Sequence, residues 1–595
     1  MKYLSVILIF LTISIPFIYS SVSGPDLKSG DDWSVPGWAT ITTNSGFFSE
    51  ETSTSSNINV GVFDVAWRQL NPSKDVYTYT ATATVKDMAF QSFNTQNSTT
   101  KSFWMRIWNS GVDWAPTWIQ SYCSVGSIGK DYDGDSHLPI WNSCVWGEIK
   151  KMYSHIFLDL NMRADPRLKF IYVPGAFNWC EFDLTEVGNY STVTGYSYTS
   201  FNTWFQQAMQ DLVDIFGPYS YKLVYTGEDY PFDVDNWPAT KNLLARDAVS
   251  KGMGIRNGIT EIFNFHLSQI PAYGVTIDTT TGYLNFNKSW PLQSNPNRVI
   301  GTENECYNDC GFTVASANIY YAVKMSNIKA LQMGVNWLYL VPSTSYISTY
   351  SDFYNWIRYS LGKQSNTAFD AWATLRNAQD TFWSSDNSLN WPGKPYIKNL
   401  ETNLLQRDIK GGAYTKNGST KKTNIYGGNN DLGISYEGRQ TDIASGNNTM
   451  SFFLDDQFSF GTIKNVQIKV TYLDLQPSQW LIRYKDNDIV LNTTAVTVGT
   501  TNIYYTATFN FTSIQFNNSI TIGRNADFEI INTGSKDIEI LFVRVVKSFS
   551  VSPGTTTGSI HNSDSGANTI EPNETSILSI SFNLLLLLSL ILSLI

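Results

Sequence analysis

The first two thirds of the chain alternate between short apolar runs and longer amphipathic stretches. Eight runs have the length and composition of buried strands: Trp38–Thr42, Val60–Trp67, Phe103–Trp108, Leu168–Val173, Tyr221–Thr226, Gly252–Arg256, Arg298–Thr302 and Val335–Val341. Helical periodicity lies between them, as in Thr84–Phe93, Trp146–Leu160, Phe201–Phe216 and Ile319–Gln332. This alternation predicts an α/β fold, a (β/α)₈ TIM barrel with long loops, over residues 24–392.

After Trp391 the pattern changes to period two. Val466–Tyr472 alternates apolar and polar residues, and turn clusters such as Gly427–Asp431 interrupt the runs. The pattern predicts an antiparallel β-sandwich of the jelly-roll type over residues 393–548. Residues 549–565 are rich in Ser, Thr and Gly and are expected to form a stalk.

Composition narrows the classes of ligand. Aromatic residues make up 14% of the chain and charged residues 15%, with a net charge of −10. The aromatic content excludes a disordered chain, and without a basic stripe we expect no nucleic acid partner. Four His and five Cys are too few and too scattered for a zinc framework, so we expect no metal and no cofactor. Uncharged polar ligands, of which sugars are the commonest, suit such a chain.

The amino-terminal segment is typical of a secretory signal. Lys2 precedes the apolar run Leu4–Phe17, and small residues follow it. The run is too short to span a membrane as a helix. We expect cleavage near Ser23, which makes residues 1–23 the signal peptide.

The carboxyl-terminal segment is typical of a GPI-attachment signal. Ser565 and two further small residues precede a polar spacer and the apolar tail Ile577–Ile595, which no Lys or Arg follows. We expect Ser565 to carry the anchor, with Ser563 or Gly566 as alternative sites, and residues 566–595 to be removed. A tail-anchored helix is the alternative to a GPI anchor. The predicted location is the extracellular face of the plasma membrane, with a GPI lipid as the membrane contact.

Because we expect the chain to be exported, we also expect N-glycosylation and disulfide bonds. The N-glycosylation pattern occurs at Asn97, Asn189, Asn287, Asn417, Asn447, Asn492, Asn510 and Asn517. Disulfides are favoured in an oxidising compartment, and the candidates are Cys123, Cys144, Cys306 and Cys310, with Cys180 left over. Cys306 with Cys310 and Cys123 with Cys144 could each close a loop, but pairing cannot be deduced from the sequence.

Several short segments, taken in order, resemble the barrel strands of β-galactosidase-like retaining glycosidases of clan A. Residues 62–72, with Trp67 and a Leu-x-Pro close, are similar to the second strand of that family. Met105–Trp108 and the Pro-x-Trp segment at 116–118 resemble the third strand and its loop. Residues 165–181 resemble the fourth strand, and residues 298–303 resemble the seventh. The chain also resembles uncharacterised barrel subfamilies of the clan that carry a C-terminal β-sandwich.

The resemblance implies a retaining glycosidase that acts on neutral oligo- or polysaccharides, with Glu181 as acid/base and Glu303 as nucleophile. Hydrolysis through a covalent intermediate needs two carboxyl groups about 5–5.5 Å apart, and the carboxyl ends of barrel strands converge on one pocket. Glu305 is the alternative nucleophile. Cys180 stands where the family has an Asn before its proton donor, which favours the second reading, a catalytically inactive glycan-binding or adhesion protein on the same scaffold.

Other residues are candidates for sugar binding. They are Trp67, Trp108, Trp118 and Trp337 as stacking faces, Asn178, Glu228 and Glu305 as hydroxyl partners, and Arg106 as a group that orients the nucleophile. An Arg inside a barrel strand is costly unless it is paired, so an acid is expected to meet Arg106.

Two further segments have weaker functional signals. Asp131–His137 resembles a calcium loop but lacks the required Gly and Glu, so it predicts an acidic turn. Val470–Asp474 and similar segments look like jelly-roll modules appended to glycosidase-like barrels. For the sandwich, carbohydrate binding and a purely structural lid on the barrel both remain open.

Overall fold

The computed structural model describes residues 24–50, 58, 60–89, 91–92, 102–131, 133–176, 180–182, 184, 190–192, 195–226, 243–257, 271–277, 283–302, 319–340, 346–376, 399–407, 421–424, 437–520 and 525–548. The chain divides into two units, Met1–Ser550 and Val551–Ile595. The second unit, with Ser565 and the apolar tail, and the expected signal peptide both lie outside the described residues. None of the helices within the described ranges is long and apolar enough to cross a membrane.

Eight parallel strands form a nearly closed barrel. They are β2 (Gly46–Phe48), β3 (Gly61–Ala66), β5 (Phe103–Trp108), β6 (Leu168–Tyr172), β7 (Leu223–Thr226), β8 (Gly254–Asn257), β11 (Ile300–Thr302) and β12 (Trp337–Tyr339). Neighbours in the sheet follow the chain order, and β12 pairs with β2. A parallel bridge between Phe48 and Val60 joins β2 to the start of β3, and β4 (Gln91–Ser92) pairs antiparallel with β3. The predicted barrel is confirmed.

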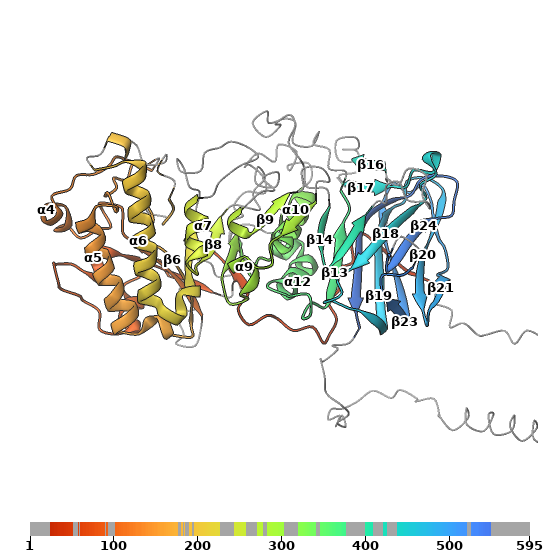
Figure 1. Ribbon diagram of the computed structural model, residues 1–595, viewed down its shortest axis with the longest axis horizontal. Coiled ribbons are helices and arrows are strands. Elements are labelled where there is room, and N and C mark those ends of the chain that lie inside the picture. Colours follow the sequence, from red (N-terminus) through yellow and green to blue (C-terminus); the bar gives the residue numbers. More distant parts are fainter. Residues whose placement is uncertain are drawn as a thin grey trace, which may run out of the picture. The chain divides into compact units, whose positions relative to one another are not determined.

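Helices connect the barrel strands, and the last two, α11 (Tyr346–Thr349) and α12 (Ser351–Ser360), follow the final barrel strand and precede β13 (Asp370–Thr374). The others are α2 (Trp67–Leu70), α3 (Thr82–Asp87), α4 (Ile119–Cys123), α5 (Ser143–Tyr153), α6 (Tyr198–Phe216), α7 (Leu243–Ser250), α9 (Pro291–Ser294) and α10 (Ile319–Gln332). A π-helical segment, η2 (Ser154–Asp159), continues α5, and the hairpin β9 (Val275–Ile277) and β10 (Leu284–Phe286) lies between β8 and β11 in the chain. Short 3₁₀ turns complete the connections: η3 (Met162–Ala164), η5 (Tyr190–Thr192), η6 (Gly217–Lys222) and η7 (Pro271–Tyr273). The helices α5 and α6 run side by side (Figure 1), and Trp146 donates its Nε1–H to Asp211 at 2.9 Å across them.

Alternation of side chains along the strands gives the barrel an outer and an inner core. On β5, Phe103, Met105 and Ile107 join the outer core with the helices, whereas Trp104 belongs to the inner core. The inner core comprises Phe48, Val60, Val62, Trp104, Phe170, Tyr172, Cys180, Val224, Val299, Trp337 and Tyr339. Arg106 follows Trp104 by two residues, so it lies on the same face, one step nearer the C-terminal end of the strand.

Two antiparallel sheets form the sandwich. The first has the order β1 (Asp26–Ser29), β23 (Tyr504–Phe516), β19 (Gly461–Leu473), β25 (Glu539–Lys547), β13 (Asp370–Thr374) and β14 (Leu400–Thr402), with β17 (Glu437–Gln440) on β25 and β16 (Lys421–Asn424) on β17. The second has the order β15 (Leu404–Arg407), β18 (Thr449–Leu454), β24 (Phe528–Asn532), β20 (Ser478–Asp486) and β21 (Ile489–Asn492), with β22 (Val496–Val498) on β20. A 3₁₀ turn, η10 (Ile443–Ser445), precedes β18. Apolar side chains of both sheets, among them Ile468, Phe509 and Phe528, share one core, which confirms the predicted sandwich.

The first predicted strand is wrong. Residues 37–38 form a turn in which the N–H of Ala39 donates to the carbonyl of Pro36 at 2.9 Å, so Trp38–Thr42 does not form a strand. The first barrel strand is β2, which has only three residues. Its place is set by pairing with β12 and not by a recognisable apolar run.

The predicted domain boundary at residue 393 does not separate the strands of the barrel from those of the sandwich. Strands β1 and β13 precede that residue, yet β1 pairs with β23, and β13 pairs with β25. Both therefore belong to the sandwich. The boundary near residue 393 stays a prediction, with the qualification that two strands of the sandwich come from the amino-terminal side of it.

The expected modifications can be examined in part. Cys123 and Cys144 form a disulfide, whereas Cys306 and Cys310 lie outside the described ranges. Among the glycosylation candidates, Asn287 and Asn492 are exposed, but Asn447 is only 2% exposed, which leaves no room for a glycan in the folded protein. The use of the candidate sites stays a prediction.

Candidate functional site

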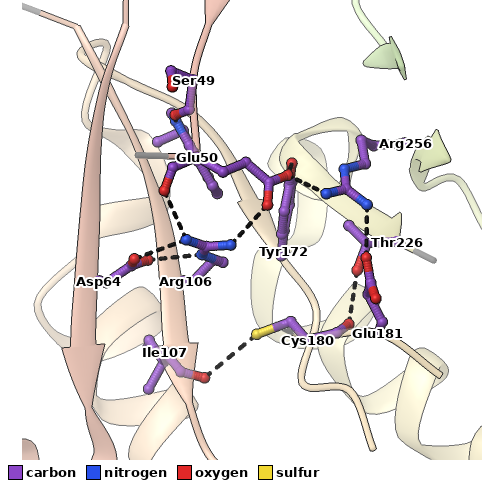
Figure 2. A network of polar contacts seen from close by, with 11 residues as sticks. Ser49, Glu50, Asp64, Arg106, Ile107, Tyr172, Cys180, Glu181, Thr226 and Arg256 are labelled. Atoms are coloured by element: carbon purple, nitrogen blue, oxygen red, sulfur yellow. Dashed lines mark hydrogen bonds and ion pairs between the residues drawn. The ribbon is translucent and has the colours of Figure 1, made fainter. Parts of the chain in front are cut away.

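Five charged side chains form one chain of ion pairs at the C-terminal end of the barrel strands, which we call the charged layer (Figure 2). In order they are Asp64, Arg106, Glu50, Arg256 and Glu181, so acid and base alternate. Asp64 is on β3, Arg106 on β5 and Arg256 on β8, while Glu50 follows β2 and Glu181 follows β6. Sequence-distant strands therefore deliver their charges to one place, as a parallel barrel does.

Arg106 is the most buried cation of the charged layer. Its Nε and Nη2 donate to the two carboxylate oxygens of Asp64, both at 2.8 Å, because β3 and β5 pair these residues in register. Its Nη1 donates to Glu50 Oε2 at 2.8 Å, and its Nη2 donates to the Glu50 carbonyl at 2.9 Å. The expectation that an acid meets Arg106 is confirmed, and two acids do so.

Glu50 links the two guanidinium groups. Its Oε2 accepts from Arg106, and its Oε1 accepts from Arg256 Nη2 and from the Tyr172 hydroxyl, the latter at 2.7 Å. Trp104 fixes the preceding residue by donating its Nε1–H to the Ser49 carbonyl at 3.1 Å. The carboxylate of Glu50 is thus satisfied from three strands of the barrel.

The backbone around Glu181 is tightly constrained. The Ala176 N–H donates to the Glu181 carbonyl at 2.6 Å, and the Thr226 hydroxyl donates to the Cys180 carbonyl at 2.7 Å. Cys180 has a φ of 66°, in the left-handed region that a non-glycine residue rarely adopts. A Cβ at Gly175 would lie 2.1 Å from the Cys180 carbonyl carbon, so only glycine fits there.

Glu181 is the point at which the charged layer meets solvent. Its side chain is 21% exposed, compared with 7% or less for each of the other four. Arg256 Nη1 donates to Glu181 Oε1 at 2.8 Å. Beside Arg256, a Cβ on Gly301 would lie 3.1 Å from the Arg256 Cβ, so the glycine leaves room for the arginine. The backbone of Glu181 is therefore fixed, its carboxylate is paired with the guanidinium of Arg256, and part of its side chain is open to solvent.

Burial and charge act against each other in the charged layer. Burial raises the pKa of Asp64, and the nearby Arg106 only partly offsets this. Burial also acts to raise the pKa of Glu50, but the guanidinium groups of Arg256 and Arg106 outweigh it and hold the pKa below its ordinary value. Burial acts to lower the pKa of Arg106, but Asp64 and Glu50 outweigh it and raise that pKa. Glu50 is accordingly a carboxylate at neutral pH.

The thiol of Cys180 has low reactivity. It is buried in the inner core and donates to the Ile107 carbonyl at 3.7 Å. Burial raises the pKa of Cys180 to about 12. Because the thiolate is the reactive form of cysteine, this thiol is a poor nucleophile.

Four predicted site residues fall in segments that the structure does not describe, namely Glu303, Glu305, Asn178 and Glu228. Glu303 directly follows β11, whose last residue is Thr302. The separation of the Glu181 and Glu303 carboxyl groups stays a prediction.

The predicted tryptophans differ in their accessibility. Trp108 is 8% exposed, and its ring centroid lies 5.9 Å from the guanidinium of Arg106, so it adjoins the charged layer. Trp67 is completely buried in the outer core, and Trp337 packs against Phe170 in the inner core. Trp118 is half-buried and donates its Nε1–H to the Asn71 carbonyl at 3.2 Å. Trp67 and Trp337 have no free face for a sugar ring in this conformation.

Sequence reasoning missed four residues of the site: Glu50, Asp64, Tyr172 and Arg256. Asp64 stands inside an apolar strand and Arg256 directly follows the uncharged run Gly252–Ile255, and a charge in such a place is the signal that could have singled them out. Glu50 has no such signal, since it follows a strand of only three residues.

The acidic turn near Asp131 is built by hydrogen bonds within the protein. Asp131 Oδ1 accepts from the N–H groups of Asp133 and Asp135, at 3.0 and 2.9 Å. Asp131 Oδ2 lies 2.8 Å from Nε2 of the buried His137. The predicted acidic turn is confirmed. Within the described ranges, no group of three acidic, His or Cys side chains is placed to hold a metal ion.

Comparisons with known proteins add little to this geometry. No protein-family model matches the chain. No curated protein matches it either. Among solved structures, a xyloglucanase of glycoside hydrolase family 44 from Paenibacillus polymyxa aligns with 85% of this chain and 99% of its own, at 8% identity and a TM-score of 0.28. A likeness of that degree carries no weight for function.

Proposed function

We propose that this chain is a cell-surface glycoside hydrolase-like protein that cleaves neutral glycans at the C-terminal end of its barrel. The observation that carries the proposal is the position of Glu181, a partly exposed carboxyl at the end of the fourth barrel strand, on the rim of the buried charged layer. Barrel enzymes place their reacting groups at this end of the strands. The aromatic-rich, sparsely charged composition supports a neutral sugar as the ligand.

In the proposed reaction Glu181 is the acid/base and Glu303 is the nucleophile. The Glu303 carboxylate attacks the anomeric carbon while Glu181 gives its proton to the departing glycosidic oxygen. Glu181 then takes a proton from water, whose oxygen displaces Glu303 from the sugar. Glu305 remains the alternative nucleophile.

A second candidate function is glycan binding without hydrolysis. The ion pair between Arg256 and Glu181, at 2.8 Å, favours the ionised carboxylate, whereas the first step of hydrolysis needs a protonated one. Cys180, in place of the Asn expected from the resemblance, also favours this candidate. Both functions require a glycan ligand, but only hydrolysis requires a proton on Glu181.

Hydrolysis assays on the purified chain with aryl glycosides and unmodified neutral oligosaccharides test the proposal. Glu303→Gln should abolish turnover, because the amide cannot form the glycosyl ester. Glu181→Gln should slow oligosaccharides far more than activated aryl glycosides, which need little protonation. Loss of turnover in Glu305→Gln, with turnover kept in Glu303→Gln, would instead identify Glu305 as the nucleophile. Binding without cleavage, equal in the wild type and both active-site variants, would favour the second function.

A further inference from the structure

Glu50 and Glu181 share one guanidinium group. Arg256 donates from Nη2 to Glu50 and from Nη1 to Glu181. Figure 2 shows the two carboxylates on different nitrogens of the same side chain. Arg256 is 2% exposed, so water screens its charge weakly. A change in the charge of Glu50 must therefore alter the electrostatic environment of Glu181.

We propose that Glu50 is a positioning residue which, by sharing Arg256 with Glu181, keeps Glu181 able to take up a proton. The inference rests on the proposed function, since only an acid/base role requires that proton. Glu50 does not touch the sugar in this proposal. It acts through Arg256.

The reasoning follows from the order of charges. A buried guanidinium that faces Glu181 alone would hold that carboxyl ionised. The Glu50 carboxylate offsets part of this positive charge, and so makes protonation of Glu181 less costly. Glu50 can do so because Arg256, Arg106 and the Tyr172 hydroxyl keep it ionised.

The other groups around Glu181 do not reverse this effect. Those that join the charged layer or adjoin Glu181 on the described elements include Asp64 of β3, Arg106 of β5, Tyr172 of β6 and the thiol of the preceding residue, Cys180. Asp64 and Arg106 are paired with each other, so their charges largely cancel. Burial raises the pKa of Tyr172 and that of Cys180, so both side chains are neutral.

Titration of Glu181 tests the inference directly. In the full chain labelled with ¹³C at the glutamate side-chain carboxyl, the Glu181 resonance is the one lost in Glu181→Gln. Glu50→Gln should lower its titration midpoint by about one pH unit or more, the effect of one nearby charge. Asp64→Asn is the matched control, because it removes a buried carboxylate from Arg106 and not from Arg256. Its shift should be clearly smaller.

The outcomes separate the inference from the proposed function. A lowered midpoint in a protein that cleaves no glycoside supports the role of Glu50 and removes hydrolysis. If glycosides are cleaved, the alkaline limb of the kcat/KM profile should move with the midpoint. An unchanged midpoint in Glu50→Gln, or equal shifts in both variants, overturns the inference. If Glu50→Gln does not fold, Glu50→Asp, which withdraws the carboxylate from Arg256, should lower the midpoint by less, and no change would overturn the inference.

Discussion

Replacing Arg106 with Met should cost the protein roughly 3–5 kcal/mol of unfolding free energy, the usual loss when one partner of a buried ion pair is removed. Four hydrogen bonds of 2.8 to 2.9 Å disappear. Charge-assisted hydrogen bonds contribute about 1.5–3 kcal/mol each, but relief from burying the guanidinium offsets part of that sum. The remaining loss comes chiefly from Asp64, whose carboxylate is completely buried and would face a methyl group.

Urea unfolding followed by tryptophan fluorescence measures this loss. The effect should be smaller at pH 5 than at pH 7. In the variant, burial raises the pKa of Asp64 further above its value in the unfolded chain, because the guanidinium no longer offsets it. A carboxyl group whose pKa is raised by folding stabilises the folded state at low pH, and this contribution is lost as the pH rises through the pKa of the folded state. Acidification therefore stabilises the variant relative to the wild type.

Two comparisons make the test specific. Arg68→Met changes an exposed arginine and should alter stability by less than about 0.5 kcal/mol. Adding Asp64→Asn to Arg106→Met should restore part of the stability, because the buried charge is gone. A loss below about 1 kcal/mol, or an equal loss at both pH values, would refute the view that Arg106 compensates a buried carboxylate.

Four further predictions concern other parts of the molecule. Gly175→Ala should reduce glycan cleavage or binding at least tenfold, because the methyl carbon would lie 2.1 Å from the Cys180 carbonyl carbon and displace Glu181; unchanged function would contradict this. Burial raises the pKa of Asp527 to about 6, so the stability of the wild type relative to Asp527→Asn should fall by about 2 kcal/mol from pH 4 to pH 7 in urea titrations, and a rise would refute it. The fragment 366–548, which keeps β13, should be soluble and folded by circular dichroism, whereas 393–548 should aggregate; equal behaviour counts against the pairing of β13 with β25. A phosphatidylinositol-specific phospholipase should release the protein from intact cells, and its retention while a GPI-anchored control is released would exclude the anchor.

Most barrel strands were predictable because each is a compact apolar run. Gly61–Ala66 and Phe103–Trp108 have six residues each, and they are buried throughout, as parallel strands covered on both faces are. Gly46–Phe48 has three residues, too few for a pattern, and is defined by its partners. Asp370–Thr374 is apolar enough to be a strand, but nothing local shows which sheet it joins.

The site was predictable in its chemistry but not in its pairing. Arg106 required an acid, which the sequence supports on physical grounds. That the acids are Asp64 and Glu50 depends on the register between β3 and β5 and on the course of the chain after β2. The neighbour of Glu181 could not be predicted, because Arg256 lies on a strand 75 residues away.

The strand β1 also has a consequence for biosynthesis. Asp26 pairs with Thr508, so the first described strand must wait for one made near the end of the chain. At roughly 5–20 residues per second, ribosomes need on the order of 25–100 s to bridge that interval. Throughout that time the sheet edge on β23 does not exist, so the early strand, whose four residues stay exposed even in the folded protein, has no sheet to join. This edge of the sandwich can therefore form only after β23 has been made.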